Sequence, residues 1–151
     1  MSATVQCRVE AAHVRPTKAD ALRDLIQQLF NRRNLAYIAP KDRMWLTVEL
    51  IQSLRRQSTV YRTLSGKTSG PLPFGIGYFR VHDGQLEPVS TTLPTDDPEV
   101  LVRVLSEFVE PGAQFTFEMD EGAVTWQVDG ENEVTRRAGA QSMGDAASAS
   151  T

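Results

Sequence analysis

The sequence predicts an α+β fold, in which a mostly antiparallel sheet built from two hairpins and an N-terminal strand carries about three helices on one face. Apolar and polar residues alternate along residues 4–10 and 115–128, which is typical of half-buried strands. Between these segments, apolar residues recur with the period of about 3.6 residues that marks amphipathic helices. Because hairpins join antiparallel neighbours, we expect an antiparallel sheet covered by helices.

The N-terminal part predicts one strand and one helix. Alternation from Thr4 to Glu10 favours the strand. Thr17 stands just after Pro16 and three residues before Asp20, which is a weak capping-box start for a helix. We expect this helix to run for about four turns and to end near Asn31, because its apolar residues follow the helical period. These residues are Leu22, Leu25, Ile26, Leu29 and Phe30.

A second helix is predicted from Pro40 and Asp42 to about Arg56. Its expected apolar side is broad, and Trp45 falls outside it. The apolar side consists of Leu46, Thr47, Val48, Leu50, Ile51 and Leu54. Residues 57–64 fit either a continued helix or a strand, so this assignment stays open.

Residues 74–81 and 85–93 predict the first hairpin. Pro88 confines the second of these strands to a sheet edge, because proline has no N–H to donate. Gly75 and Gly77 in the first strand indicate a bulge or the close approach of another backbone, including that of a partner.

A third helix is predicted to begin at Asp97 and Pro98, which form the favoured cap and first-turn pair. It is expected to end at residues 111–112 and to be the helix most deeply packed against the sheet. Its wide apolar arc consists of Val100, Leu101, Val104, Leu105, Phe108 and Val109.

The second hairpin is predicted over residues 115–128, with its aromatic face inward and its acidic face outward. A further short strand is expected over residues 133–137. We therefore expect a single domain over residues 1–137. The Ala/Ser/Gly-rich residues 138–151 have too few apolar side chains to offset their ordering entropy, so we expect a disordered tail.

Composition places the chain among globular proteins. It has 151 residues, of which 40% are hydrophobic and 23% are charged. No apolar run reaches the ~20 residues of a membrane-spanning helix, and no secretory signal pattern is present. A single cysteine, Cys7, cannot form an internal disulfide. We therefore expect a cytoplasmic protein that has no membrane partner.

Charge is sorted along the chain. Residues 1–81 contain 13 Lys and Arg against 5 Asp and Glu, whereas residues 82–151 contain 3 against 14. The formal net charge of −3 at pH 7 therefore hides a basic half and an acidic half. Such asymmetry indicates a charged partner, or two halves that face each other.

Patterns that support catalysis or metal binding are weak. Cys7, His13 and His82 do not have the spacing of zinc ligands, and the Gly-x-Ser-x-Gly motif of serine hydrolases does not occur. The paired carboxylates lie in predicted turns and caps, where solvated acids are ordinary. We therefore expect no metal, no cofactor and no catalytic residue that the sequence can name. An enzyme whose site assembles from scattered residues remains a third hypothesis.

The basic half offers a candidate nucleic-acid or polyanion surface, formed by the second helix and the loop after it. Arginine presents forked donors to phosphate or carboxylate, and an exposed aromatic ring can stack on an unpaired base. The candidate residues are Arg32, Arg33, Arg43, Trp45, Arg55, Arg56, Arg62 and Lys67. The alternative is a solvated helix face with charges at helix ends, and the pI of about 5.4 argues against a dedicated DNA-binding protein.

The acidic half offers a second candidate face on the outer hairpin and its flanks. The candidate residues are Glu118, Asp120, Glu121 and Asp129. They would present negative charge to a basic partner, as an inhibitor or an immunity protein does. The alternative is that they protect a sheet edge from aggregation, and the two roles are compatible.

From the charge separation and the weak catalytic patterns we expect a small non-enzymatic protein-interaction module. It would act as a cytoplasmic regulator, adaptor or inhibitor that docks on a protein partner through electrostatic complementarity. The alternative is a nucleic-acid-binding protein that uses the basic segment 32–67. A homo-oligomer stays open, because the two charged halves can also neutralise each other across a dimer contact.

Overall fold

The fold is known from a computed structural model, which describes residues 3–65, 72–95, 97–120 and 122–138. Its helices are α1 (Ala19–Asn31), α2 (Pro40–Gln57), α3 (Thr59–Leu64) and α4 (Pro98–Leu105). Short 3₁₀ helices are η1 (Pro16–Lys18), η2 (Arg33–Tyr37) and η3 (Phe74–Tyr78). The strands are β1 (Ala3–Glu10), β2 (Phe79–His82), β3 (Gln85–Pro88), β4 (Thr92–Thr95), β5 (Gln114–Met119), β6 (Gly122–Gly130) and β7 (Glu133–Ala138).

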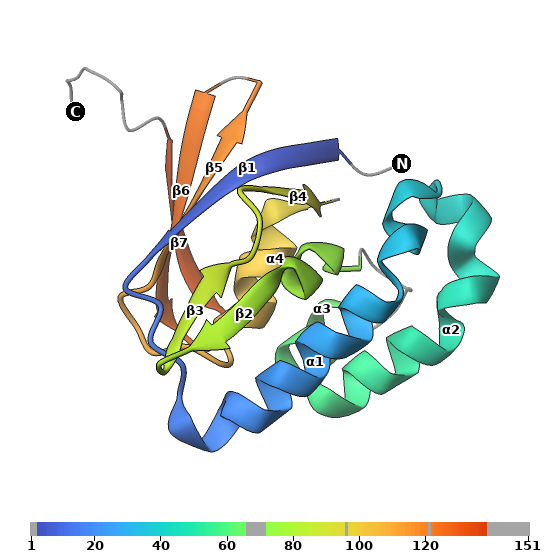
Figure 1. Cartoon of the computed structure of the whole chain (residues 1–151), viewed down its shortest axis with the longest axis horizontal. Coiled ribbons are helices and arrows are strands. Elements are labelled where there is room, and N and C mark those ends of the chain that lie inside the picture. The colour runs from blue at the N-terminus through green and yellow to red at the C-terminus, as the bar shows by residue number, and fades with distance from the viewer. Residues whose placement is uncertain (1–2, 66–71, 96, 121, 139–151) are drawn as a thin grey trace.

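The predicted α+β class is confirmed. Figure 1 shows the main sheet on one side of the molecule and α1 and α2 on the other, with α4 and η3 between them. The strand order is β4-β1-β5-β6-β7, and every neighbouring pair is antiparallel. Strands β2 and β3 form a two-stranded sheet separate from the five-stranded one, and an isolated antiparallel bridge joins Gln85 of β3 to His13.

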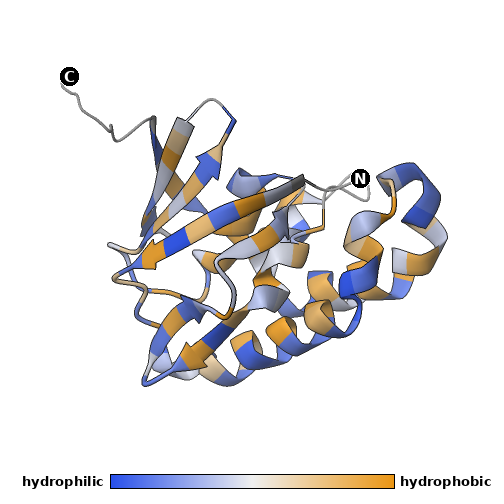
Figure 2. Ribbon diagram, turned by 45° about the horizontal axis from the view of Figure 1, so that its top comes forward, coloured by the Kyte–Doolittle hydropathy of each residue, from blue (hydrophilic) through white to orange (hydrophobic). Residues whose placement is uncertain are grey.

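One face of the five-stranded sheet forms the core of the protein. Phe115 and Phe117 of β5 have no exposed surface, and neither does Val128 of β6. Apolar and polar residues alternate as orange and blue bands along β1 in Figure 2, as the period of two residues in a strand requires. Glu118 and Asp120 are exposed. The predicted inward aromatic face and outward acidic face are therefore confirmed.

Residues 74–78 form η3, where the sequence predicted a strand. A Cβ atom on Gly77 would lie 2.7 Å from the backbone nitrogen of Phe30 and 3.0 Å from the carbonyl carbon of Leu29. The backbone of α1 thus approaches η3 more closely than any side chain allows. The strand prediction was wrong because this packing, rather than strand pairing, determines the local conformation. The close backbone approach that the glycines indicate occurs within the chain itself.

The strand predicted over residues 85–93 is divided into two. β3 ends at Pro88 and pairs with β2, whereas β4 begins at Thr92 and pairs with β1. Proline cannot donate to a strand ladder, so the first pairing stops there and the chain crosses to the main sheet. Both strands lie at sheet edges, as Pro88 indicates.

The start of α4 is as predicted, and its end is not. The Asp97 carboxylate accepts hydrogen bonds from the backbone nitrogens of Glu99 at 3.0 Å and Val100 at 3.5 Å. Pro98 occupies the first turn, where a missing N–H costs nothing. The helix ends at Leu105, before the expected residues 111–112. Its C-terminal half is buried apart from Arg103, because Leu101, Val102, Val104 and Leu105 have no exposed surface.

The start of α1 also differs from the prediction. Thr17 lies in η1, and the helix begins at Ala19 with Lys18 as its N-cap and no side-chain cap. The predicted capping box with Asp20 therefore does not form. The predicted end at Asn31 is correct.

The open segment 57–64 contains α3, which Ser58 separates from α2. Ser58 has an extended backbone, and its Oγ accepts a hydrogen bond from the backbone nitrogen of Tyr61 at 2.9 Å. The same hydroxyl donates to the carboxylate of Glu107 at 2.7 Å. The helical alternative for this segment is therefore the correct one, with a break at Ser58.

The predicted end of the domain lies one residue before the end of the last strand. β7 continues to Ala138, just past the expected domain end at residue 137. The rest of the predicted tail, residues 139–151, lies outside the described residues, as do the candidate site residues Lys67 and Glu121. Within the described ranges, no helix is both long enough and apolar enough to cross a membrane.

Candidate functional site

Helix α2 has two faces, because its packing partners lie on one side of it. It contacts α1, α3 and η2. The residues that it buries recur with the helical period and are Arg43, Thr47, Leu50, Ile51 and Leu54. The opposite side is an exposed or half-buried stripe, which we call the α2 outer face. It consists of Lys41, Met44, Trp45, Val48, Glu49, Gln52, Arg55 and Arg56.

The first turns of the α2 outer face are apolar and exposed. Trp45 is 90% exposed, Met44 is 55% exposed and Val48 is 43% exposed. Leu46, on the flank of this face, is 59% exposed. The predicted apolar side of the helix is therefore wrong for Leu46 and Val48, because α1 and α3 cover a narrower arc. Clustered large apolar side chains on a surface are typical of an interaction site.

Arg43 belongs to the interior and not to a binding face. It is 3% exposed, and its Nη1 donates to the carbonyl oxygens of Leu35 at 3.1 Å and Ile38 at 2.9 Å. Its guanidinium carbon lies 4.9 Å from the centroid of the Phe74 ring, within the range of a cation–π contact. Arg43 thus ties η2 and η3 to α2, which corrects its predicted place in the basic face.

The other described basic candidates form two groups. Arg32 and Arg33 follow the C-terminal end of α1, beside the N-terminal half of α2 (Figure 1). The Arg33 guanidinium lies 4.2 Å from the Phe30 ring centroid. At the C-terminal end of α2, the Nε of Arg62 donates to the carbonyl oxygen of Arg55 at 2.9 Å. The basic candidates therefore do not make one continuous face.

The described acidic candidates are divided between the two ends of the second hairpin. Glu118 and Asp120 lie near the β5–β6 turn, and Asp129 lies at the far end of β6. The Asp129 carboxylate accepts hydrogen bonds from the Thr135 hydroxyl and, at 3.0 Å, from the Gln127 amide. These bonds, that of Thr135 above all, lower the pKa of Asp129. Figure 1 shows the strands β5 and β6 and the helix α2 on opposite sides of the molecule.

Cys7 is buried on the inner face of the sheet. It is 6% exposed, and burial raises the pKa of its thiol to about 12. The thiol is therefore protonated at neutral pH, whereas the thiolate is the nucleophilic form. In the part of the chain that the structure describes, no three His, Cys, Asp or Glu side chains are grouped so that they can hold a metal ion.

A second apolar cluster lies where α1 meets η3. The rings of Phe30 and Tyr78 meet edge to face, with 6.2 Å between their centroids. A pocket of about 230 Å³ adjoins them, and Val89 at its margin is 63% exposed. Burial, and then a hydrogen bond with Tyr37, raise the pKa of Tyr78 to about 12. The Tyr78 hydroxyl is therefore protonated at neutral pH, and the charge beside the cluster is that of the Arg33 guanidinium.

Two groups of surface residues were missed by the sequence analysis. Met44, Leu46 and Val48 are exposed. The sequence could have predicted this, because the apolar residues of the helix cover a wider arc than neighbours on one side can bury. Arg136 pairs with Trp126 across β6 and β7, so both side chains lie on the apolar face of the sheet. The alternation of residues along the strands could have predicted this position.

Comparison with known proteins found no protein family, no curated protein and no solved structure that matches the chain.

Proposed function

We propose that this protein is a small non-enzymatic interaction module, a cytoplasmic regulator, adaptor or inhibitor, that docks on a partner protein through the α2 outer face. The partner presents an apolar groove with acidic side chains at its rim. The observation that carries the proposal is the 90% exposure of Trp45 among other exposed apolar side chains of one helix.

The apolar side chains have the spacing of helix-in-groove recognition. Met44 and Val48 are four residues apart, and Trp45 and Val48 are three apart, so all of them project from neighbouring turns on one side. Tryptophan and methionine are enriched at the centres of protein interfaces, and tryptophan is the commonest kind of energetic hot spot. Trp45 is therefore the expected anchor of the contact.

The charges around this apolar group determine which charge the rim of the partner's groove should carry. Lys41 precedes the apolar turns and Arg55 and Arg56 follow them on the same face, which carries one acid, Glu49. Residues 1–81, which include α2, carry 13 Lys and Arg against 5 Asp and Glu. A positive field of this kind accelerates association with an acidic surface and disfavours a basic one.

A protein groove fits this surface better than a nucleic acid does. Met44 and Val48 flank Trp45 and offer no donor to a phosphate group. Arg43 is buried, and the other described arginines among the basic candidates are divided between two groups. A nucleic-acid channel instead needs a continuous basic groove with aromatic rings along it.

A pull-down experiment tests this proposal by comparing the proteins that surface variants bind. The immobilised full chain is exposed to lysate of the organism that makes it, with nuclease added to half of the sample. Trp45→Ala removes the expected anchor. Val89→Ala is the matched control, because Val89 is an exposed apolar residue between β3 and β4. We expect a protein that wild type and Val89→Ala retain and Trp45→Ala loses.

Binding measurements with the purified chain and the purified partner then give the change in affinity. Trp45→Ala should weaken the affinity about 30-fold or more, as hot-spot residues do. Arg56→Glu should slow association and reduce its dependence on salt concentration. A partner that binds Trp45→Ala as tightly as wild type contradicts the proposal. Retention that nuclease abolishes favours nucleic-acid binding instead.

A further inference from the structure

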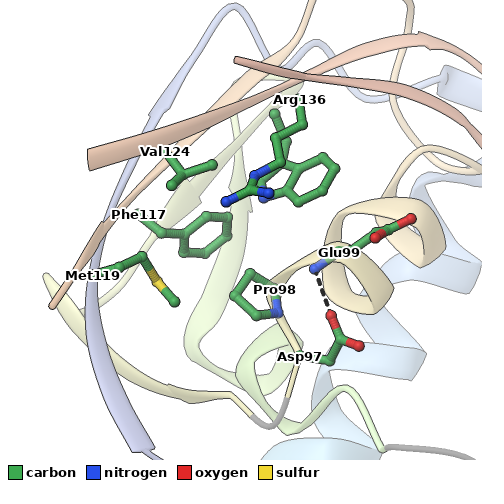
Figure 3. Close-up of a pocket in the computed structure, with 8 residues that line it drawn as sticks. Asp97, Pro98, Glu99, Phe117, Met119, Val124 and Arg136 are labelled. Carbon is green, nitrogen blue, oxygen red and sulfur yellow. Dashed lines mark hydrogen bonds between the residues drawn. The ribbon is translucent and has the colours of Figure 1, made fainter. Parts of the chain in front are cut away.

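A pocket of about 290 Å³ lies between the N-terminus of α4 and the apolar face of the sheet (Figure 3). It is built from α4, β5, β6 and β7, so it is independent of the α2 outer face. Its apolar lining consists of Pro98, Phe117, Met119, Val124 and Trp126. Its polar lining consists of Asp97, Glu99 and Arg136. The volume is near the lower end of the range for small-ligand sites.

Arg136 brings a positive charge to this apolar pocket. It pairs with Trp126 across β6 and β7 and therefore shares the inner face of the sheet. Its guanidinium carbon lies 5.8 Å from the centroid of the indole ring. Figure 3 shows the guanidinium over the pocket, directed toward Phe117. The neighbouring Arg137 pairs with Thr125 and lies on the opposite face.

The two acids at the pocket already have partners. Asp97 caps α4 by accepting from the backbone nitrogen of Glu99 at 3.0 Å. The Glu99 carboxylate accepts from the Nε of Arg103 at 2.8 Å, and Figure 3 shows it pointing away from the cavity. Arg103 also donates to the carbonyl oxygen of Asn132 at 2.7 Å, which holds the β6–β7 turn against α4. Among the described lining residues, the guanidinium of Arg136 is therefore the cationic group that the pocket offers to a ligand.

We propose that this pocket binds the carboxylate of an apolar acid, which is either a free small acid or the C-terminal residue of a peptide. The guanidinium of Arg136 pairs with both carboxylate oxygens through its forked N–H donors. The apolar group of the ligand packs against the rings of Phe117 and Trp126. β7 is the last strand of the sheet among the described residues, and a peptide backbone can pair with the outer edge of such a strand.

Tryptophan fluorescence tests this proposal. The chain has two tryptophans, so the full chain with Trp45→Phe leaves Trp126 as the reporter. The probes are phenylpropionate and an acetylated peptide that ends in phenylalanine, each compared with its neutral amide. We expect a saturable change in Trp126 emission with the acids, and binding about tenfold weaker or less with the amides. Arg136→Gln should weaken binding of the acids by a similar factor.

Matched variants separate recognition from general effects. Arg137→Gln changes the same charge on the opposite face of β7 and should leave binding unchanged. Arg136→Lys keeps the charge without the fork, and its affinity should lie between those of wild type and Arg136→Gln. Binding of phenylpropionate alone assigns the site to a free acid, and binding of the peptide alone assigns it to a C-terminus. Equal binding of acid and amide, unchanged binding by Arg136→Gln, or no saturable response up to about 1 mM overturns the proposal.

Discussion

The Oγ of Ser58 lies 2.7 Å from Oε1 of Glu107, and both side chains are buried. The same carboxylate accepts hydrogen bonds from the backbone nitrogens of Thr59 at 3.3 Å and Val60 at 3.1 Å. The carboxylate also forms a salt bridge with the ammonium of Lys18, at 3.3 Å. One carboxylate thus satisfies the first N–H groups of α3 and joins that helix to the segment after α4 and to η1.

Glu107→Ala should therefore lower the free energy of unfolding by about 3 kcal/mol, because it leaves buried donors without an acceptor. Urea denaturation measures this loss. Glu110→Ala is the matched control, since Glu110 is exposed on the same segment, and its effect should stay within about 0.5 kcal/mol. Equal effects of the two substitutions would contradict the buried hydrogen-bond network.

Arg43→Met should destabilise the protein by about 2 kcal/mol. The carbonyl oxygens of Leu35 and Ile38 lose their guanidinium donor, and the Phe74 ring loses its cation. Thermal unfolding followed by circular dichroism gives the shift. Lys41→Met, an exposed change of the same charge on the same helix, should leave the midpoint nearly unchanged. A larger effect of Lys41→Met would place Arg43 outside the core.

Gly77→Ala should lower the free energy of unfolding by about 1–3 kcal/mol, because the new methyl group meets the backbone of Phe30 and Leu29 rather than a movable side chain. Denaturant titration measures the change. Gly130→Ala is the control, since its new methyl group meets the flexible end of Glu133. If both variants were equally stable, α1 and η3 would not be in such close contact.

Cys7 and Tyr61 should make the fold less stable at alkaline pH. Burial raises the pKa of Cys7 from 9.0 to about 12 and that of Tyr61 from 10.0 to about 12, the latter against the opposing charge of Arg55. Between these values the unfolded chain has lost protons that the folded chain keeps. The free energy of unfolding therefore falls as the pH rises from 9.0 to about 12. Urea denaturation at a series of pH values should show a shallower fall for Cys7→Ala, and parallel curves would contradict this assignment.

Local patterns predicted most of the fold. The hairpin of β5 and β6 was predicted correctly because strict alternation leaves one register that buries Phe115 and Phe117. The cap at Asp97 was correct because the aspartate and the following proline act within one turn. The errors at residues 74–78 and 85–93 have a different origin. There, contacts with α1 and β1, which are distant in the sequence, determine the conformation.

The candidate site was less predictable than the fold. Whether Val48 is buried depends on which neighbours cover α2, and no local pattern contains that information. Arg43 falls at a buried helical position, yet its charge suggested a place on the surface. The exposure of Trp45, in contrast, follows from its position on the helical wheel, outside the predicted apolar side.

The interior position of β1 has a consequence for biosynthesis. Its partners β4 and β5 begin at Thr92 and Gln114, so β1 is made long before either of them exists. Until translation passes β5, the apolar side chains of Val5 and Cys7 have no neighbouring strands to cover them. The main sheet can therefore close only after β5 has been made, and a ribosome stalled before β5 would expose an unpaired β1 that can pair with other nascent chains.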